Sequence, residues 1–175
     1  MDWYQTIFDL IDTRSFSNMW FWIALAVVWS SASHWVLGVP FDMVYRARRK
    51  GGQAEADLQD IVRVNASRML YIADTAGMVI LALVCFLLTM LAMLGWVYAI
   101  EFAQAVFLLA FPLSLVGALS LFTARRIQAN GEQGADLRRS LSRCRIYIQM
   151  IGAVSIFVTA LWGMYQNISL SILGG

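Results

Sequence analysis

Apolar and charged positions divide the chain into long apolar runs and short charged stretches. Residues 75–100 form a run of 26 uncharged residues, and residues 102–124 form a run of 23. Either run exceeds the roughly 20 residues that an α-helix needs to cross a hydrocarbon layer about 30 Å thick. Only Glu101 stands between them. The pattern therefore predicts a transmembrane hairpin whose spans we place at 69–94 and 102–124.

Two more apolar stretches extend this pattern towards both ends of the chain. No formal charge occurs between Arg14 and Asp42, which predicts a span at about 16–39, and the final apolar stretch predicts a span at about 146–167. We therefore expect an all-α integral membrane protein, with four transmembrane helices in two hairpins that form one domain over residues 1–175.

The prolines and the connecting segments indicate where these predicted helices end, bend or continue. Pro40 is expected to end the first span or bend its last turn. Pro112 is expected to kink the third span and to free the carbonyl of Leu108. Residues 54–68 contain no glycine or proline, and we expect them to run as a helix into the second span.

The segment 2–14 has a helical pattern of its own. Three aspartates, Asp2, Asp9 and Asp12, lie off one apolar face. That face contains Trp3, Tyr4, Ile7, Phe8 and Ile11. This arrangement predicts a short N-terminal amphipathic helix lying in the membrane interface.

Composition and charge support this fold and orient it. The chain is 60% hydrophobic and only 14% charged, with a mean hydropathy of +0.66, whereas soluble domains carry about 25% charge. Of the 13 Lys and Arg residues, all but Arg14 lie in the two predicted loops, 42–68 and 125–145. By the positive-inside rule both loops face the cytoplasm. We expect a multi-pass protein of the bacterial inner membrane with both termini in the periplasm.

One pair of polar residues falls inside the predicted membrane region. Asp74 lies just inside the inner leaflet of the second span, and His34 is expected at a similar depth in the first. Charged groups at such depths are costly and face protein, water or a partner. A His34–Asp74 contact would suit proton handling or the positioning of a cofactor. The alternatives are a structural polar contact between helices or an Asp74 side chain directed towards Arg68 or Tyr71.

The basic clusters are candidates for contacts with anionic lipid headgroups, each cation contributing about 1 kcal/mol near an acidic leaflet. The alternative is that they only set the topology. The candidate residues are Arg46, Arg48, Arg49, Lys50, Arg125, Arg126, Arg138 and Arg139.

Small residues recur every four positions on three of the predicted spans, which allows close approach of helices. We interpret these stripes as packing faces rather than a substrate path. They are Ala26, Ser30, His34 and Gly38; Ala110, Ser114 and Ala118; and Ser155, Thr159 and Gly163.

Residues for catalysis or metal binding are not recognisable. Cys85 and Cys144 are predicted at different depths, too far apart for a disulfide, and two cysteines with one histidine make no zinc or cluster motif. Phosphate-binding glycine loops and hydrolase motifs do not occur. We expect no enzymatic activity, no cofactor, no metal and no nucleic-acid partner.

Three segments carry a resemblance to a known family: residues 16–20 (FSNMW), 32–43 (ASHWVLGVPFDM) and 155–167 (SIFVTALWGMYQN). They resemble a family of small, uncharacterised bacterial four-helix inner-membrane proteins. Its members are sometimes labelled as a component of the Suf iron–sulfur assembly complex. The resemblance implies a membrane fold over nearly the full length, and it carries over no catalytic residues.

These observations predict a non-catalytic accessory or scaffolding subunit of a larger inner-membrane complex, for example a bioenergetic complex. Its partners would be membrane lipids and other integral membrane subunits, with self-association as a further option. The alternative is a small homo-oligomeric transporter or channel that uses His34 and Asp74.

Overall fold

The structure is a computed structural model that describes residue 16 and residues 19–173, with side chains described up to residue 168. The amphipathic helix predicted at 2–14 lies outside the described residues. Helices form nearly all of the described chain. The elements are α2 (Met19–His34), β1 (Trp35–Val36), β2 (Val39–Pro40), α3 (Phe41–Lys50), α4 (Gln53–Ala92), the π-helical turn η2 (Met93–Val97), α5 (Glu101–Asn130) and α6 (Gly134–Leu173).

The all-α prediction is confirmed, and three helical segments are long and apolar enough to cross a membrane. They cover Gln53–Val97, Glu101–Asn130 and Gly134–Ile168. The second, third and fourth predicted spans lie within these three segments.

The first predicted span is shorter than expected. Helix α2 has 16 residues, about 24 Å at 1.5 Å per residue, which is less than a hydrocarbon layer of about 30 Å. The helix ends at His34 because Leu37 and Gly38 take positive φ angles of 54° and 70° and form a tight turn between β1 and β2. The expectation of a helix to Val39 is therefore wrong, and a fourth transmembrane helix is not confirmed.

The segments predicted as loops, 42–68 and 125–145, are mostly helical in the structure. Helix α4 begins at Gln53 and continues without interruption to Ala92, as expected for residues 54–68. Helix α5 extends to Asn130, and Gly131 ends it in the left-handed conformation that favours glycine. Only residues 131–133 separate α5 from α6.

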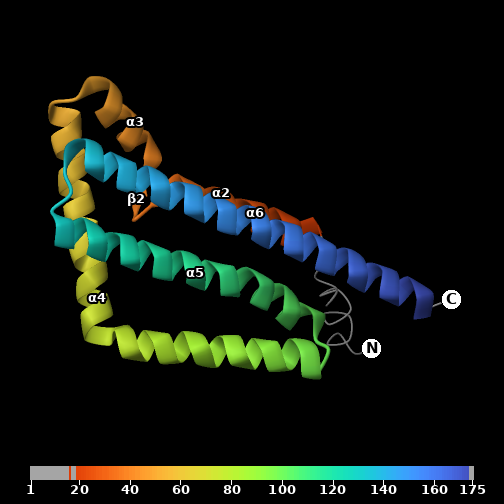
Figure 1. Ribbon diagram of the computed structural model, residues 1–175. Coiled ribbons are helices and arrows are strands. Elements are labelled where there is room, and N and C mark those ends of the chain that lie inside the picture. Colours follow the sequence, from red (N-terminus) through yellow and green to blue (C-terminus); the bar gives the residue numbers. More distant parts are fainter. Residues whose placement is uncertain (1–15, 17–18, 174–175) are drawn as a thin grey trace, which may run out of the picture.

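The long helices form an open row rather than a closed bundle. Helix α4 packs on α5, α5 packs on α6, and α6 packs on α2. Figure 1 shows that α4 also bends, so its first part crosses the ends of α5 and α6 and its second part runs beside α5. The second part of α4 and helix α2 consequently lie at the two edges of the row.

The main buried core lies at the end of the molecule where α3 and the start of α4 meet α5 and α6. The β1–β2 hairpin contributes Val36, Leu37 and Val39, each no more than 3% exposed. The remaining members are Phe41, Val44, Ala47, Leu58, Val62, Ala66, Leu70, Ala124, Ile127, Leu137, Leu141, Cys144 and Ile148. We call this region the basic end, because both predicted cationic clusters adjoin it.

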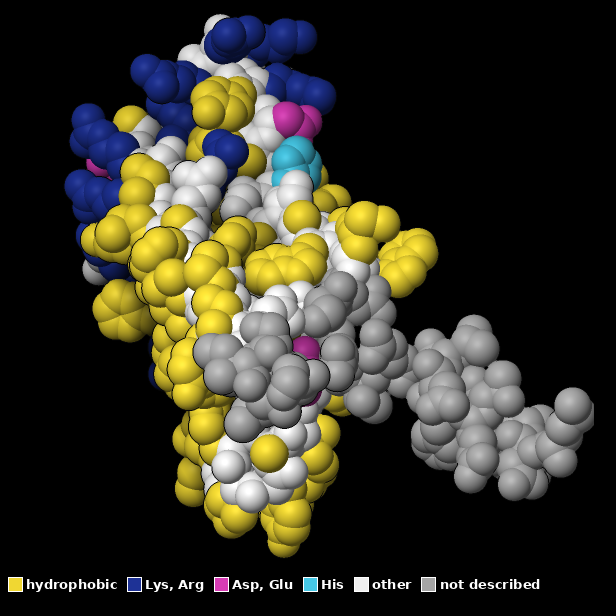
Figure 2. Space-filling model, turned by 90° about the vertical axis from the view of Figure 1, so that its right-hand side faces the viewer, with side chains coloured by type: hydrophobic (Ala, Val, Ile, Leu, Met, Phe, Trp, Pro, Cys, Tyr) yellow, Lys and Arg dark blue, Asp and Glu magenta, His cyan; other side chains and the backbone are white. Residues whose placement is uncertain are grey.

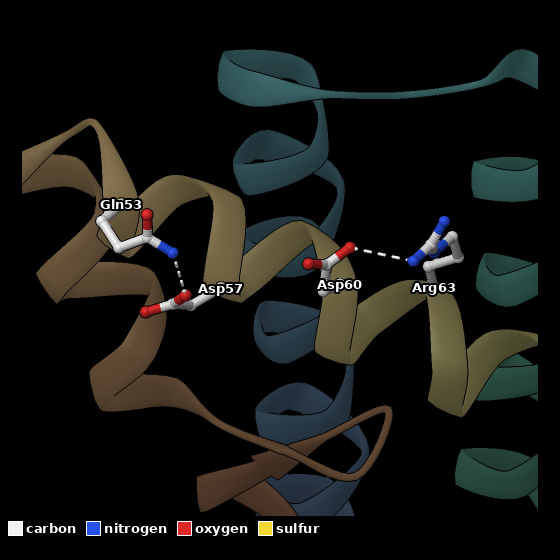
Figure 3. A network of polar contacts seen from close by, with 4 residues as sticks. All are labelled: Gln53, Asp57, Asp60 and Arg63. Atoms are coloured by element: carbon white, nitrogen blue, oxygen red, sulfur yellow. Dashed lines mark hydrogen bonds and ion pairs between the residues drawn. The ribbon is translucent and has the colours of Figure 1, made fainter.

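The first part of α4 is amphipathic. Leu58, Val62 and Ala66 recur every four residues and are buried in the core. Its outer face carries a hydrogen bond from Gln53 Nε2 to Asp57 Oδ1 and an ion pair of Asp60 with Arg63 (Figure 3). This segment therefore covers the basic end with its apolar face and presents its polar face outwards.

The same part of α4 also holds the turn of the β1–β2 hairpin in place. Asn65 Nδ2 donates a hydrogen bond to the Gly38 carbonyl at 3.1 Å.

The small-residue stripes differ in burial. On α6, Ser155, Thr159 and Gly163 are all buried, as predicted for a packing face. Ser155 Oγ donates to the Leu108 carbonyl at 3.4 Å, which is the acceptor that Pro112 leaves free in α5. By contrast, Ala26, Ser30 and His34 on α2 and Gly38 in the β1–β2 turn are all exposed, and the buried residues of α2 are Leu25 and Trp29. The prediction of a packing face was wrong for α2.

We expect Gly152→Ala to lower the free energy of unfolding by about 1–3 kcal/mol, the usual cost of overpacking. A Cβ atom at Gly152 would lie 2.7 Å from the Trp29 ring, which packs there from α2. Thermal unfolding in detergent measures the effect. Gly117→Ala is the matched control, because no atom lies within 4 Å of its Cβ position. Equal stability of both variants would contradict the α2–α6 contact.

Candidate functional site

His34 and Asp74 do not form a pair. The Asp74 carboxylate lies 3.6 Å from a guanidinium nitrogen of Arg125 on α5, and the two side chains are 73% and 57% exposed. The His34 ring lies at the end of α2 and is roughly perpendicular to the Trp35 ring, with 6.1 Å between the ring centroids. Asp74 therefore makes a polar contact between helices, but with a residue other than His34, Arg68 or Tyr71.

The predicted cationic residues gather at the basic end, where Figure 2 shows most Lys and Arg side chains above a largely hydrophobic surface. Four of them have carboxylate partners: Arg125 with Asp74, Arg126 with Glu132, Arg138 with Glu55, and Arg139 with Asp136. The other four, Arg46, Arg48, Arg49 and Lys50, are exposed on α3.

Glu132 balances Arg126 in the turn between α5 and α6. Its Oε1 lies 3.4 Å from Arg126 Nε and 3.3 Å from Asn130 Nδ2. Burial is the largest single influence and by itself raises the pKa of Glu132. The polar groups of Ser140 and Asn130 and the charge of Arg126 together outweigh it, so the pKa lies below the ordinary value of 4.5. Arg126 is therefore compensated within the chain, unlike several arginines nearby.

An open hollow of about 820 Å³ lies between α3 and the start of α6. Its polar lining consists of Arg48, Arg138, Arg139, Ser142, Arg143, Arg145, Tyr45 and Gln149, and its apolar lining consists of Phe41, Val44, Ala135 and Ile146. We call this the α3–α6 hollow. Sequence analysis placed Arg48, Arg138 and Arg139 among the lipid-contact candidates, but it missed Arg143 and Arg145. Their i,i+4 and i,i+7 spacing to Arg139 and Arg138 was the available signal.

A buried amide at the opposite end was also missed. Gln104 on α5 is 4% exposed. Its Nε2 donates to the Gly95 carbonyl at 2.7 Å, and its Oε1 accepts from Trp162 Nε1 at 2.9 Å and Gln166 Nε2 at 2.6 Å. Gln104 thus joins η2, α5 and α6 at the α4–α5 turn. The available signal was a single amide inside an otherwise apolar run, because buried polar groups require partners.

The side chains of the second part of α4 are almost all exposed or only partly buried. No residue is buried between Leu70 and Gly95, and the most apolar 18-residue stretch of this segment has a mean hydropathy of 2.7 with 0% of it buried. Met78 is 85% exposed and Phe86 63%. Such a surface requires an apolar environment, either lipid or another membrane protein.

Within the part of the chain that the structure describes, no three His, Cys, Asp or Glu side chains come close enough to hold a metal ion. Cys85 and Cys144 are free thiols, Cys85 exposed on α4 and Cys144 buried in the core. The prediction that they form no disulfide is confirmed.

Comparison with known proteins adds no relative: no family model, no curated protein and no solved structure matches the chain. The resemblance described above to a family labelled as Suf-associated stays a prediction.

We expect Gln104→Leu to lower the free energy of unfolding by about 1–3 kcal/mol, because three hydrogen bonds are lost, one of them to the buried Gly95 carbonyl. Thermal unfolding in detergent, followed by tryptophan fluorescence, measures the change and reports on Trp162. Gln128→Leu, an exposed position on the same helix, is the control. A Gln104 variant no less stable than this control would refute the role of Gln104 as the link at this end.

Proposed function

We propose that the protein is a non-catalytic accessory subunit of a larger assembly in a bacterial inner membrane. The observation that supports this proposal is the exposed apolar surface of the second part of α4. Helix α6 packs on both α5 and α2, whereas this part of α4 has α5 on one side and no other long helix of the described residues packed along its remaining faces. An integral membrane partner that packs along α4 would complete the row of helices.

The charge distribution supports an orientation for the protein. Twelve of the 13 cationic side chains belong to segments at or next to the basic end, so the positive-inside rule would place that end in the cytoplasm. The α4–α5 turn and both termini would then lie in the periplasm. Partner subunits would approach α4 within the bilayer rather than from either solvent.

The alternative of a transporter or channel depended on His34 and Asp74. Asp74 has Arg125 as its neighbour, and His34 lies on the exposed face of α2. These two residues therefore do not form the polar pair on which the transporter hypothesis depended, so we favour the accessory role.

Site-specific photo-crosslinking in cells tests the proposed role of α4. A benzophenone side chain at Met78 should form a covalent adduct with one integral membrane protein that also co-purifies with the wild-type chain in mild detergent. The same group at Val154 is the control, because this α6 position is also exposed, at 63%, but lies off α4. Adducts only with lipid, or only with a second copy of this chain, would contradict the proposal.

The two candidate functions differ in what they expect of Asp74→Asn. For an accessory subunit, the variant should lose less than about 1 kcal/mol of stability, because exposed ion pairs contribute little, and it should retain its partner. Thermal unfolding and quantitative co-purification measure both effects. A variant that assembles normally but abolishes solute flux in proteoliposomes would favour the transporter.

A further inference from the structure

We propose that the α3–α6 hollow binds the phosphate of an anionic phospholipid, with Arg48, Arg143 and Arg145 as the binding cations. The hollow has no Asp or Glu in its lining although five arginines border it. Two of the five are compensated, Arg138 by Glu55 and Arg139 by Asp136. The other three have no carboxylate within ion-pair distance among the described residues, so the hollow holds unbalanced positive charge.

Arg145 is the best placed of the three cations to hold an anion. Its guanidinium carbon lies 4.1 Å from the centroid of the Phe41 ring, so one face of the group is held by the aromatic side chain. Its Nε is buried and has no hydrogen-bond partner in the described part of the chain. A buried N–H without an acceptor is costly. The planar guanidinium fork suits a phosphate, which accepts two parallel hydrogen bonds.

The apolar lining favours a lipid over free phosphate. Ile146 is 54% exposed, and Phe41, Val44 and Ala135 complete the apolar lining of the hollow. Arg145 and Ile146 also mark the point in α6 where the charged segment ends and the apolar span begins. A phosphodiester at this level would have its acyl chains beside the apolar side chains, as a headgroup at the membrane interface requires.

Lipid binding by the full-length protein in detergent, measured by native mass spectrometry, tests this assignment. The probe is phosphatidylglycerol, with phosphatidylcholine as the zwitterionic comparison and inorganic phosphate as a competitor. The variant Arg48→Gln/Arg143→Gln/Arg145→Gln should bind phosphatidylglycerol about a hundredfold more weakly, because each cation near an anionic lipid contributes a factor of about five.

The matched control is Arg46→Gln/Arg49→Gln/Lys50→Gln, which removes the same charge from exposed positions of α3 outside the hollow. It should retain nearly the wild-type affinity. Equal weakening in the control would show diffuse attraction to the basic end, and absence of phosphatidylglycerol binding by the wild type would show no lipid site. Full competition by inorganic phosphate at equal concentration would show a free-phosphate site. Each of these results overturns the proposal.

Arg145→Lys provides a second, milder variant. Lysine keeps the charge but loses the planar fork and its stacking on Phe41, so phosphatidylglycerol binding should weaken about tenfold, the usual effect of losing one hydrogen bond to a charged group. Circular dichroism verifies folding of every variant. If the triple variant does not fold, this single variant decides: unchanged affinity overturns the assignment.

Discussion

The structure depends on the apolar core at the basic end, where the β1–β2 hairpin, α3 and the first part of α4 close over the ends of α5 and α6. The hairpin places Val36, Leu37 and Val39 in this core, and Asn65 holds its turn by a hydrogen bond. Burial of this apolar surface supplies a driving force that packing between helices inside a bilayer lacks, since lipid tails are as apolar as leucine. The tertiary contacts are accordingly dense at this end.

The opposite end combines a buried polar side chain with aromatic contacts of Trp96 with Phe107 and Trp162. Gln104 joins the α4–α5 turn to α6 through three hydrogen bonds. Between the two ends, the second part of α4 has little contact beyond α5 among the described residues. A helix satisfies its backbone hydrogen bonds internally, so it needs no further neighbour for that purpose. This combination of two fixed ends and one open helix face is what makes an accessory role the best-supported proposal. It also separates the proposed partner surface, inside the bilayer, from the proposed lipid site at the basic end.

The sequence predicted the long helices well but predicted the contacts between them poorly. The long uncharged runs predicted the helices of the α4–α5 hairpin and of α6, and Pro112 correctly indicated a free carbonyl at Leu108. The stripe on α6 packs as predicted, but the equally regular stripe on α2 is exposed. Periodicity shows which residues share a helix face, but it does not show whether a neighbouring helix or lipid lies against that face. The same limit explains why Asp74 was matched with His34, at a similar expected depth, rather than with Arg125.

By itself, the sequence determined the helical class, the three long apolar helices and the gathering of cations into two segments, because hydropathy and charge act locally along the chain. The tertiary structure alone decided that α2 ends at His34, that α4 bends across α5 and α6, and that Arg143 and Arg145 line one hollow with Arg48. These features depend on contacts between segments distant in sequence, whose energies become available only when the helices are packed.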